Sequence, residues 1–532
     1  MRILDQDAKR AVQEVITAHE AELRGILGYV SAEPGFPIVN GAVQKEPAII
    51  VYVSHKKPPT HVLEEERAPR QLGKYRVAVM QADPFRQLMS MSDHEDMAAR
   101  VTESATSLTY KPVPDNPINA SFEVNKPLLC HVGPDAGWPV LKPFLEAAQH
   151  TLSVAMYDFN ADYIAKAFID AVRASSLQVV LTWDNGMTPP ETTIRNKLKS
   201  SLGQRLDGWV VQCGAGRRFA SAYHEKVVVR DSAAFWLSSG NWSLRSQPDI
   251  DPIGDPTTAK GMYGKGNREW HIIVEDEVLA KLFESYITHD RDGSEQEAED
   301  GDPGAVLDRA DLMGFPDVFV PMETLLGGPE LAAIAEPVPP QILPSTARPL
   351  TVFPVLSPDN YIGRLMELLH TATRSIYLQF SYINFSDAAK DVGFREMLSP
   401  LAEMSYRSDM DIRIIVGSNG AVDKIRKLVE SGFKETVFRS QRNVHNKGIV
   451  VDGRIVLVSS ANWSGDGVLR NRDAGLIIHD EEVAAYYQNV FLDDWENRAK
   501  AFLDDDPPVI VAAENAETPP GMVRMPWREY FD

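Results

Sequence analysis

Apolar residues in the first 125 positions follow two different periods. Between residues 7 and 26 they return every three or four positions, a spacing that predicts an amphipathic helix. Shorter apolar runs at 48–53 and 75–80 are typical of strands. We therefore expect residues 1–125 to form a small α+β domain of unknown role. No catalytic combination of side chains is evident in it.

Beyond this domain, two long stretches repeat one order of apolar patterns, over residues 126–289 and 348–502. In the first stretch, helix-like and strand-like runs alternate between residues 138 and 182. In the second, a predicted helix at 362–373 precedes a predicted strand at 375–380. Alternating strands and helices predict an α/β sandwich for each stretch.

The segments between and after these stretches are polar. Residues 290–347 begin with an acidic run and continue into a Pro-rich section, so we expect a solvated linker. Residues 503–532 form an acidic tail. The tail carries three aromatic side chains that could pack against the rest of the chain, namely Trp527, Tyr530 and Phe531.

The composition is typical of a soluble protein and limits the range of partners. Of the 532 residues, 44% are hydrophobic and 24% charged, and the formal net charge is −21. Generic nucleic-acid binding needs a basic face, and adsorption to an anionic membrane needs positive charge, so both are disfavoured. Apolar runs are far shorter than a membrane span, and no signal peptide is evident. With two cysteines, Cys130 and Cys213, a disulfide framework is not the basis of the fold. We expect a cytoplasmic protein.

The strongest local signal is a motif that occurs once in each repeated stretch. The first copy consists of His224, Lys226, Asp231, Ser239 and Asn241, and the second of His445, Lys447, Asp452, Ser460 and Asn462. The two copies agree in every spacing, which is strong support for an internal repeat.

Strand geometry explains how each copy could form half of a site. Residues i and i+2 of a strand share a face, so each His and its Lys point the same way. The turns at Asp231-Ser232 and Asp452-Gly453 predict hairpins, whose second strands return the Ser and Asn beside the His. Neither half alone offers both a nucleophile and a general acid. Face to face they offer both, with Lys and Asn donors for phosphate oxygens, and this chemistry requires no metal or cofactor.

These residues resemble the signature of the phospholipase D superfamily, His-x-Lys-x4-Asp-x6-Gly-Ser-x-Asn, present once per half. Ser238 and Ser459 stand where the family usually has Gly. The resemblance covers residues 128 to 500. It implies two fused α/β sandwich halves with pseudo-twofold symmetry and one site at their interface.

The resemblance also implies a role for each residue. His224 would attack phosphorus and His445 would protonate the leaving alcohol, although the symmetry of the sequence permits the reverse. Phosphate oxygens would be held by Lys226, Lys447, Asn241 and Asn462, with help from Ser239 and Ser460. Two acids that follow the motifs, Glu269 and Asp473, would orient the histidines. The motif aspartates Asp231 and Asp452 would be structural.

The substrate is less well specified than the chemistry. We favour hydrolysis or transfer at a phospholipid headgroup bond, because both signatures stand in one acidic polypeptide, as in the phospholipases. A nuclease acting on DNA or RNA is the first alternative. The second is a binding or regulatory protein that acts through its N-terminal domain. Because the halves are fused, we expect a monomer.

Overall fold

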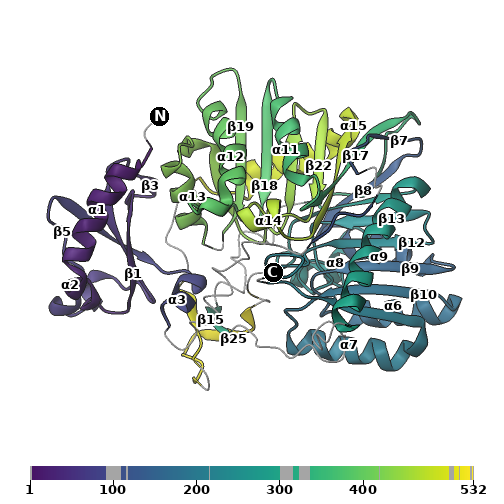
Figure 1. Ribbon diagram of the computed structural model, residues 1–532, viewed down its shortest axis with the longest axis horizontal. Helices are drawn as coiled ribbons and strands as arrows, with labels where there is room; N and C mark the ends of the chain where they lie inside the picture. Colours follow the sequence, from purple (N-terminus) through teal and green to yellow (C-terminus); the bar gives the residue numbers. More distant parts are fainter. Residues whose placement is uncertain are drawn as a thin grey trace.

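Two large sheets dominate the computed structural model of the chain (Figure 1). The structure describes residues 3–91, 110–114, 118–214, 216–299, 316–322, 336–418, 420–501, 508–513, 516–527 and 530. Each large sheet has eight strands, and helices pack against both sheets. The predicted α/β class is confirmed.

The N-terminal unit is a four-stranded mixed sheet covered by helices. Its strand order is β1 (Tyr29–Gly35), β4 (Ala48–Val53), β6 (Tyr75–Gln81) and β5 (Gln71–Leu72). The helices are α1 (Gln6–Ala18), α2 (Glu20–Arg24) and α3 (Pro84–Ser90). Every residue of β4 is buried, as its unbroken apolar run requires, and Val12 and Ile16 of α1 pack against it.

The first half has the strand order β11-β10-β9-β12-β13-β14-β8-β16. Along the chain its elements are β8 (Leu128–Gly133), α5 (Gly137–Glu146), β9 (Thr151–Met156), α6 (Asp162–Ser175), β10 (Gln178–Asp184), α7 (Pro189–Leu202), β11 (Leu206–Val211), β12 (Lys226–Arg230), β13 (Ala234–Ser238), α8 (Pro256–Tyr263), β14 (Glu269–Val274) and α9 (Glu277–Glu299).

The second half has the strand order β20-β19-β18-β21-β22-β23-β17-β7, which matches the first half strand by strand. Its elements are β17 (Leu350–Ser357), α11 (Tyr361–His370), β18 (Ser375–Phe380), α12 (Val392–Met404), β19 (Asp411–Gly417), α13 (Ala421–Glu430), β20 (Phe438–Gln441), β21 (Lys447–Val451), β22 (Ile455–Ser459), α14 (Gly465–Leu469), β23 (Asp473–His479) and α15 (Glu481–Asn497).

One edge strand of each sheet comes from the segment that leads into the other half. Strand β7 (Phe122–Val124) directly precedes β8 in the sequence but pairs with β17 of the second sheet. Strand β16 (Gln341–Leu343) precedes β17 but pairs with β8 of the first sheet. The two halves therefore exchange edge strands.

The structure differs from the predicted boundaries at three places. Strand β7 lies within residues 1–125, assigned above to the N-terminal domain, and β16 lies within the expected linker at 290–347. Helix α9 also continues into that stretch, as far as Glu299. Asp290 is fully buried there rather than solvated, because it forms an ion pair with Arg472. Later members of the acidic run, Asp300 and Asp302, lie outside the described residues.

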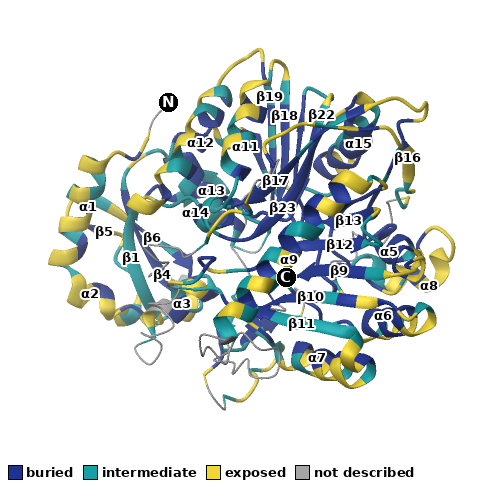
Figure 2. Cartoon of the chain, turned by 45° about the vertical axis from the view of Figure 1, so that its right-hand side comes forward, coloured by how far each residue is buried: buried dark blue, intermediate teal, exposed yellow. Residues whose placement is uncertain are grey.

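A shared hydrophobic core joins the halves. Val227 of β12 and Trp270 of β14 belong to one buried cluster with Val450 of β21 and Val458 of β22. The Trp270 ring lies over Gly448, where an added Cβ would come within 2.2 Å of a ring carbon. Figure 2 shows that the inner strands of both sheets are mostly buried, whereas the outer faces of the helices are exposed. No described helix is long and apolar enough to cross a membrane.

A small third sheet unites parts of the expected linker and tail. Its strand order is β24 (Ile510–Val511), β15 (Val318–Pro321) and β25 (Met522–Met525). It packs against α3 (Figure 1). The Trp527 ring meets the Phe85 ring edge-on, with centroids 4.8 Å apart. Tyr530 is buried in the same cluster, and Phe531 lies outside the described residues.

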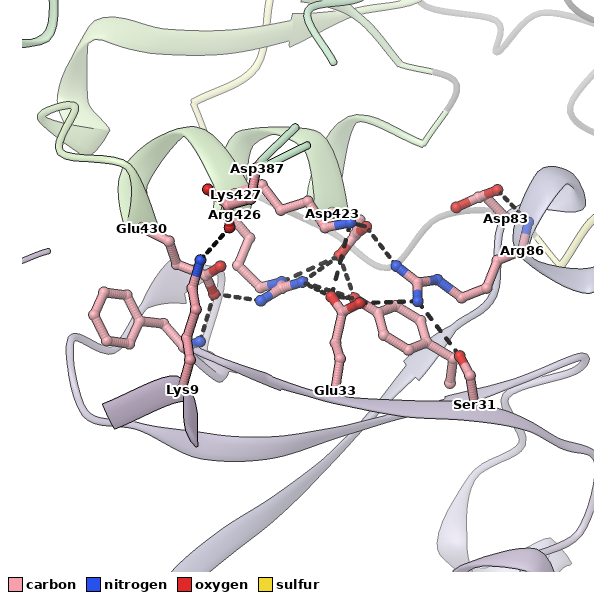
Figure 3. A network of polar contacts seen from close by, with 12 residues as sticks. Lys9, Ser31, Glu33, Asp83, Arg86, Asp387, Asp423, Arg426, Lys427 and Glu430 are labelled. Carbon is pink, nitrogen blue, oxygen red and sulfur yellow. Dashed lines mark hydrogen bonds and ion pairs between the residues drawn. The ribbon is translucent and has the colours of Figure 1, made fainter. Parts of the chain in front are cut away.

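The N-terminal unit is fixed to the second half by a buried polar network (Figure 3). Arg426 of α13 donates to Glu33 and to Asp423, at 2.7 and 2.8 Å, and Arg86 of α3 pairs with both of these acids. Gly35 lies against the Arg426 guanidinium, where a Cβ would approach within 2.1 Å of Nη1. The unit is therefore an integral part of the molecule rather than a tethered module.

Candidate active site

Each motif begins just before a strand of one half, at a point where its backbone bonds to the other half. His224 and His445 stand two residues before Lys226 and Lys447, the first residues of β12 and β21. The backbone N–H of His224 donates to the carbonyl oxygen of Arg472 at 2.7 Å, and that of His445 donates to the carbonyl oxygen of Arg268 at 3.2 Å. The opposite half therefore fixes the backbone of each histidine.

The imidazole rings are also held across the interface. His224 Nδ1 lies 2.8 Å from Asp473 Oδ1, and His445 Nδ1 lies 2.8 Å from Glu269 Oε1. Each acid thus orients the histidine of the other half, not the one in its own half. The exposed fraction is 7% for His224 and 3% for His445, so charge interactions act here in a water-poor environment.

Both lysines are fully buried beside their histidines. Lys226 Nζ donates to the carbonyl oxygen of His224 at 2.8 Å, and Lys447 Nζ donates to that of His445. Lys447 Nζ also lies 3.5 Å from the carbonyl oxygen of Ser239, in the first half. The positive charge of Lys447 favours the ionised form of both Glu269 and Asp473. Both motifs therefore contribute to one site.

The motif serines contact the acids. Ser239 Oγ donates to Glu269 Oε2 at 2.6 Å, and Ser460 Oγ donates to Asp473 Oδ1 at 2.8 Å. Each hydroxyl oxygen accepts a backbone N–H from the residue after the acid. In this structure the serines position the carboxylates, whereas the sequence led us to expect help with phosphate.

The motif asparagines differ between the halves. Asn462 Oδ1 accepts a hydrogen bond from Ser381 Oγ at 3.0 Å. Asn241 is fully buried, and its amide oxygen and nitrogen both lack a hydrogen-bond partner among the described residues. A buried amide without partners is unfavourable unless a ligand satisfies it. Asn241 is therefore suited to binding a polar ligand.

The two orienting acids lie in unequal environments. Glu269 accepts hydrogen bonds from His445, Ser239 and Ser246 Oγ, the last at 2.8 Å. Burial raises its pKa, but His445 and its other donors outweigh burial and lower the pKa to about 2. Asp473 accepts its hydrogen bonds at Oδ1, and Oδ2 is buried without a partner among the described residues. Burial raises the pKa of Asp473 to about 7, despite the opposing charge of Lys226.

The motif aspartates lie at the far ends of their strands. Asp231 and Asp452 have positive φ angles of 54° and 53° in the two hairpin turns. The Asp231 carboxylate accepts backbone N–H groups of residues 149–151, and Asp452 accepts those of residues 373–375. These bonds join each hairpin to the preceding helix–strand turn, which is a structural role.

No group of three or more His, Cys, Asp or Glu residues is arranged to hold a metal ion within the part of the chain that the structure describes.

Comparison with known proteins identifies the family. The sequence model described as "Cardiolipin synthase, PLD-like domain" matches residues 365–495. The mitochondrial cardiolipin hydrolase of Xenopus laevis is 28% identical over 157 residues, which cover 27% of this chain and 70% of that protein. The same enzyme of Xenopus tropicalis is 29% identical over 151 residues, covering 28% and 69%. These matches support membership of the phospholipase D superfamily.

This superfamily member is an enzyme of the phosphodiesterase class, so the resemblance carried by the two signatures is confirmed. Among solved structures, phosphatidylserine synthase of Haemophilus influenzae Rd KW20 is similar, with a TM-score of 0.44 and 14% identity. That similarity covers 71% of this chain and 90% of the synthase.

Sequence reasoning missed one direct contributor to the candidate site. Ser246, which donates to Glu269, lies in the long segment between Ser243 and Asn267. In the second half the equivalent segment, from Ser464 to Asn471, is much shorter. A repeat can indicate only what both copies share, so this serine gave no signal.

Proposed function

We propose that the protein cleaves phosphodiesters through a covalent phosphohistidine, with His224 as the nucleophile and His445 as the general acid. The crossed histidine–carboxylate pairs carry this proposal, because they bring two oriented imidazoles to one interface. The phosphate would be bound by Lys226, Lys447, Asn241 and Asn462, of which Asn241 is the clearest donor.

The first step forms a P–N bond between His224 Nε2 and phosphorus, while the P–O bond to the leaving alcohol breaks. His445 gives its Nε2 proton to the departing oxygen. In the second step, His445 removes a proton from water, or from an acceptor alcohol, whose oxygen attacks phosphorus. The P–N bond then breaks, and neutral His224 is restored.

The unequal acids support this assignment of roles. An ionised Glu269 stabilises the charged imidazolium of His445, which is the form that a general acid needs. Asp473 has a pKa of about 7 and holds less negative charge near neutrality, which favours the neutral imidazole of His224. An imidazole can attack phosphorus only when its Nε2 is unprotonated.

A phospholipid is the substrate that we propose. The relatives and the family model that match this chain are named for cardiolipin, a phospholipid with phosphodiester bonds. The net charge of −21 disfavours nucleic acid and anionic membranes alike, so the choice of a phospholipid rests on these matches.

A substrate whose leaving group needs no proton distinguishes the nucleophile from the general acid experimentally. With bis-p-nitrophenyl phosphate, His445→Ala should release a burst of p-nitrophenol and accumulate an acid-labile phosphoenzyme, because attack proceeds but hydrolysis stalls. His224→Ala should give no burst. In the wild-type protein, a trapped phosphoryl group on His445 instead of His224 would overturn the assignment. Vesicles containing cardiolipin, compared with single-stranded DNA in EDTA, then test the substrate class, and cleavage of DNA alone would favour a nuclease.

A further inference from the structure

An arginine directly precedes each orienting acid, and both arginines are buried. Arg472 stands before Asp473 and Arg268 before Glu269, with exposed fractions of 0% and 2%. Buried guanidinium groups need several charge-assisted hydrogen bonds to offset the loss of water. The partners of these two arginines follow one plan.

Arg472 is held by acids from both halves. Its Nε and Nη2 donate to the two oxygens of Asp290, at 2.8 and 2.9 Å, and Asp290 belongs to α9 of the first half. Its Nη1 donates to Asp359 Oδ2 at 2.8 Å and to the carbonyl oxygen of Ser357 at 3.1 Å, both in the second half.

Arg268 repeats this arrangement with the halves exchanged. Its Nε and Nη2 donate to the two oxygens of Asp494, at 2.9 and 3.3 Å, and Asp494 belongs to α15 of the second half. Its Nη1 donates to Asp135 Oδ2 at 2.5 Å and to the carbonyl oxygen of Gly133 at 2.9 Å, both in the first half. Both arrangements are bidentate, the geometry that fixes a guanidinium most firmly.

The spacing in the sequence is the same in both halves. Asp290 stands 21 positions after Glu269, and Asp494 stands 21 positions after Asp473. The helix that follows the acid of one half therefore holds the arginine next to the acid of the other half.

Each arginine fixes two parts of the site at once. The backbone of Arg472 continues into Asp473, and its carbonyl oxygen accepts the N–H of His224. The backbone of Arg268 continues into Glu269, and its carbonyl oxygen accepts the N–H of His445. A shift of either guanidinium would move a carboxylate and the histidine that it orients together.

We propose that Arg268 and Arg472 are positioning residues for the phosphodiesterase reaction. Each one, locked by a carboxylate from the opposite half, sets the geometry of one histidine–acid pair. The inference rests on the proposed function of this site. We assign neither arginine a contact with substrate, because both guanidinium groups are buried and bonded to the partners named above.

The test compares Arg472→Lys with a matched control, Arg218→Lys, in the full-length protein. Arg218 is also buried, and it also bonds to α9, through Glu297, Ser294 and the carbonyl oxygen of Asp290, whose Oδ1 lies 3.8 Å from Arg218 Nη1. It adjoins no orienting acid. A lysine keeps the charge at both positions but cannot reproduce the bidentate contact.

With bis-p-nitrophenyl phosphate, Arg472→Lys should lower kcat about 10-fold to 100-fold and leave KM within about twofold, since small misplacements of reacting groups have effects of this size. The acid limb of the pH profile of kcat should shift, because the His224–Asp473 hydrogen bond is altered. The Nδ1 proton resonance of His224 should move upfield. Arg218→Lys should retain the wild-type kcat, pH profile and resonance.

Equal losses of kcat in the two variants, or a loss with an unchanged pH profile and resonance, would overturn the positioning role. Should Arg472→Lys fail to fold, Asp290→Asn breaks the bidentate contact, because it replaces one acceptor oxygen with an NH2 group and removes the charge, while it keeps the arginine. It should reproduce the kcat and pH effects. Folding failure of both, with a folded Arg218→Lys, would also count against the proposal. Wild-type protein that forms no phosphohistidine would refute the proposed function instead.

Discussion

Replacing the two orienting acids by their amides should change stability in opposite directions, although both substitutions should abolish catalysis. Burial raises the pKa of Asp473 from the ordinary 3.8 to about 7. Burial also acts on Glu269, but His445, Lys447 and Ser239 outweigh it and lower the pKa from 4.5 to about 2. One buried carboxyl group therefore resists ionisation, and the other favours it.

Proton linkage gives the sign and the size of each effect. The folded chain holds the Asp473 proton more tightly than the unfolded chain, so this group favours folding below pH 3.8 and loses that contribution as the pH rises to about 7. Above pH 7, its ionisation costs the folded state about 4 kcal/mol, at about 1.4 kcal/mol per pH unit. Glu269 contributes about 3 kcal/mol above its ordinary pKa, which is lost as the pH falls through its folded-state pKa.

Thermal unfolding of Asp473→Asn and Glu269→Gln tests this reasoning, because each variant exchanges one oxygen for an amide nitrogen. At pH 8, Asp473→Asn should unfold at a higher temperature than the wild type, and Glu269→Gln at a lower one. The gain for Asp473→Asn should shrink at pH 5, where the wild-type carboxyl group is largely protonated. If both variants were destabilised equally at pH 8, the electrostatic difference between the two pairs would be refuted.

Three further substitutions probe other parts of the molecule. Asn241→Ala should lower kcat/KM about 10-fold or more with little change in melting temperature, because its amide has no partner among the described residues; retained activity would argue against phosphate binding there. Gly448→Ala should destabilise the protein by about 1–3 kcal/mol in urea unfolding, because the methyl group meets the Trp270 ring, and an unchanged midpoint would contradict that packing. Arg426→Met should remove the buried cation that bridges Glu33 and Asp423 and speed hydrogen exchange in residues 3–91, whereas unaltered exchange would mean that this network does not fix the unit.

Local patterns predicted several strands and both hairpin turns of the motifs. The apolar run at 48–53 and the predicted strand at 375–380 coincide with β4 and β18. Both predicted hairpin turns are present, and Asp231 accepts a positive φ because its side chain binds neighbouring backbone. Where one strand and one turn decide the geometry, sequence spacing is sufficient.

Features that depend on how the halves meet were beyond such reasoning. The acids at Glu269 and Asp473 were recognisable, but their crossed pairing with the histidines depends on packing between two sheets. The exchanged strands β7 and β16 have three residues each, too few for an apolar period. Asp290 was hidden within an acidic run, although its spacing from Glu269 matches that of Asp494 from Asp473 and could have revealed it.

The reciprocal donation of β7 and β16 has a consequence for dividing the molecule. A polypeptide cleaved between α9 and β16 would yield an N-terminal fragment that carries a strand it cannot use and lacks one that it needs, and the C-terminal fragment would have the opposite deficit. Co-expressed fragments should complement each other into an active pair, whereas either one produced alone would leave an open sheet edge prone to aggregation. Each repeated stretch of the sequence thus needs a strand from outside itself to complete its sheet.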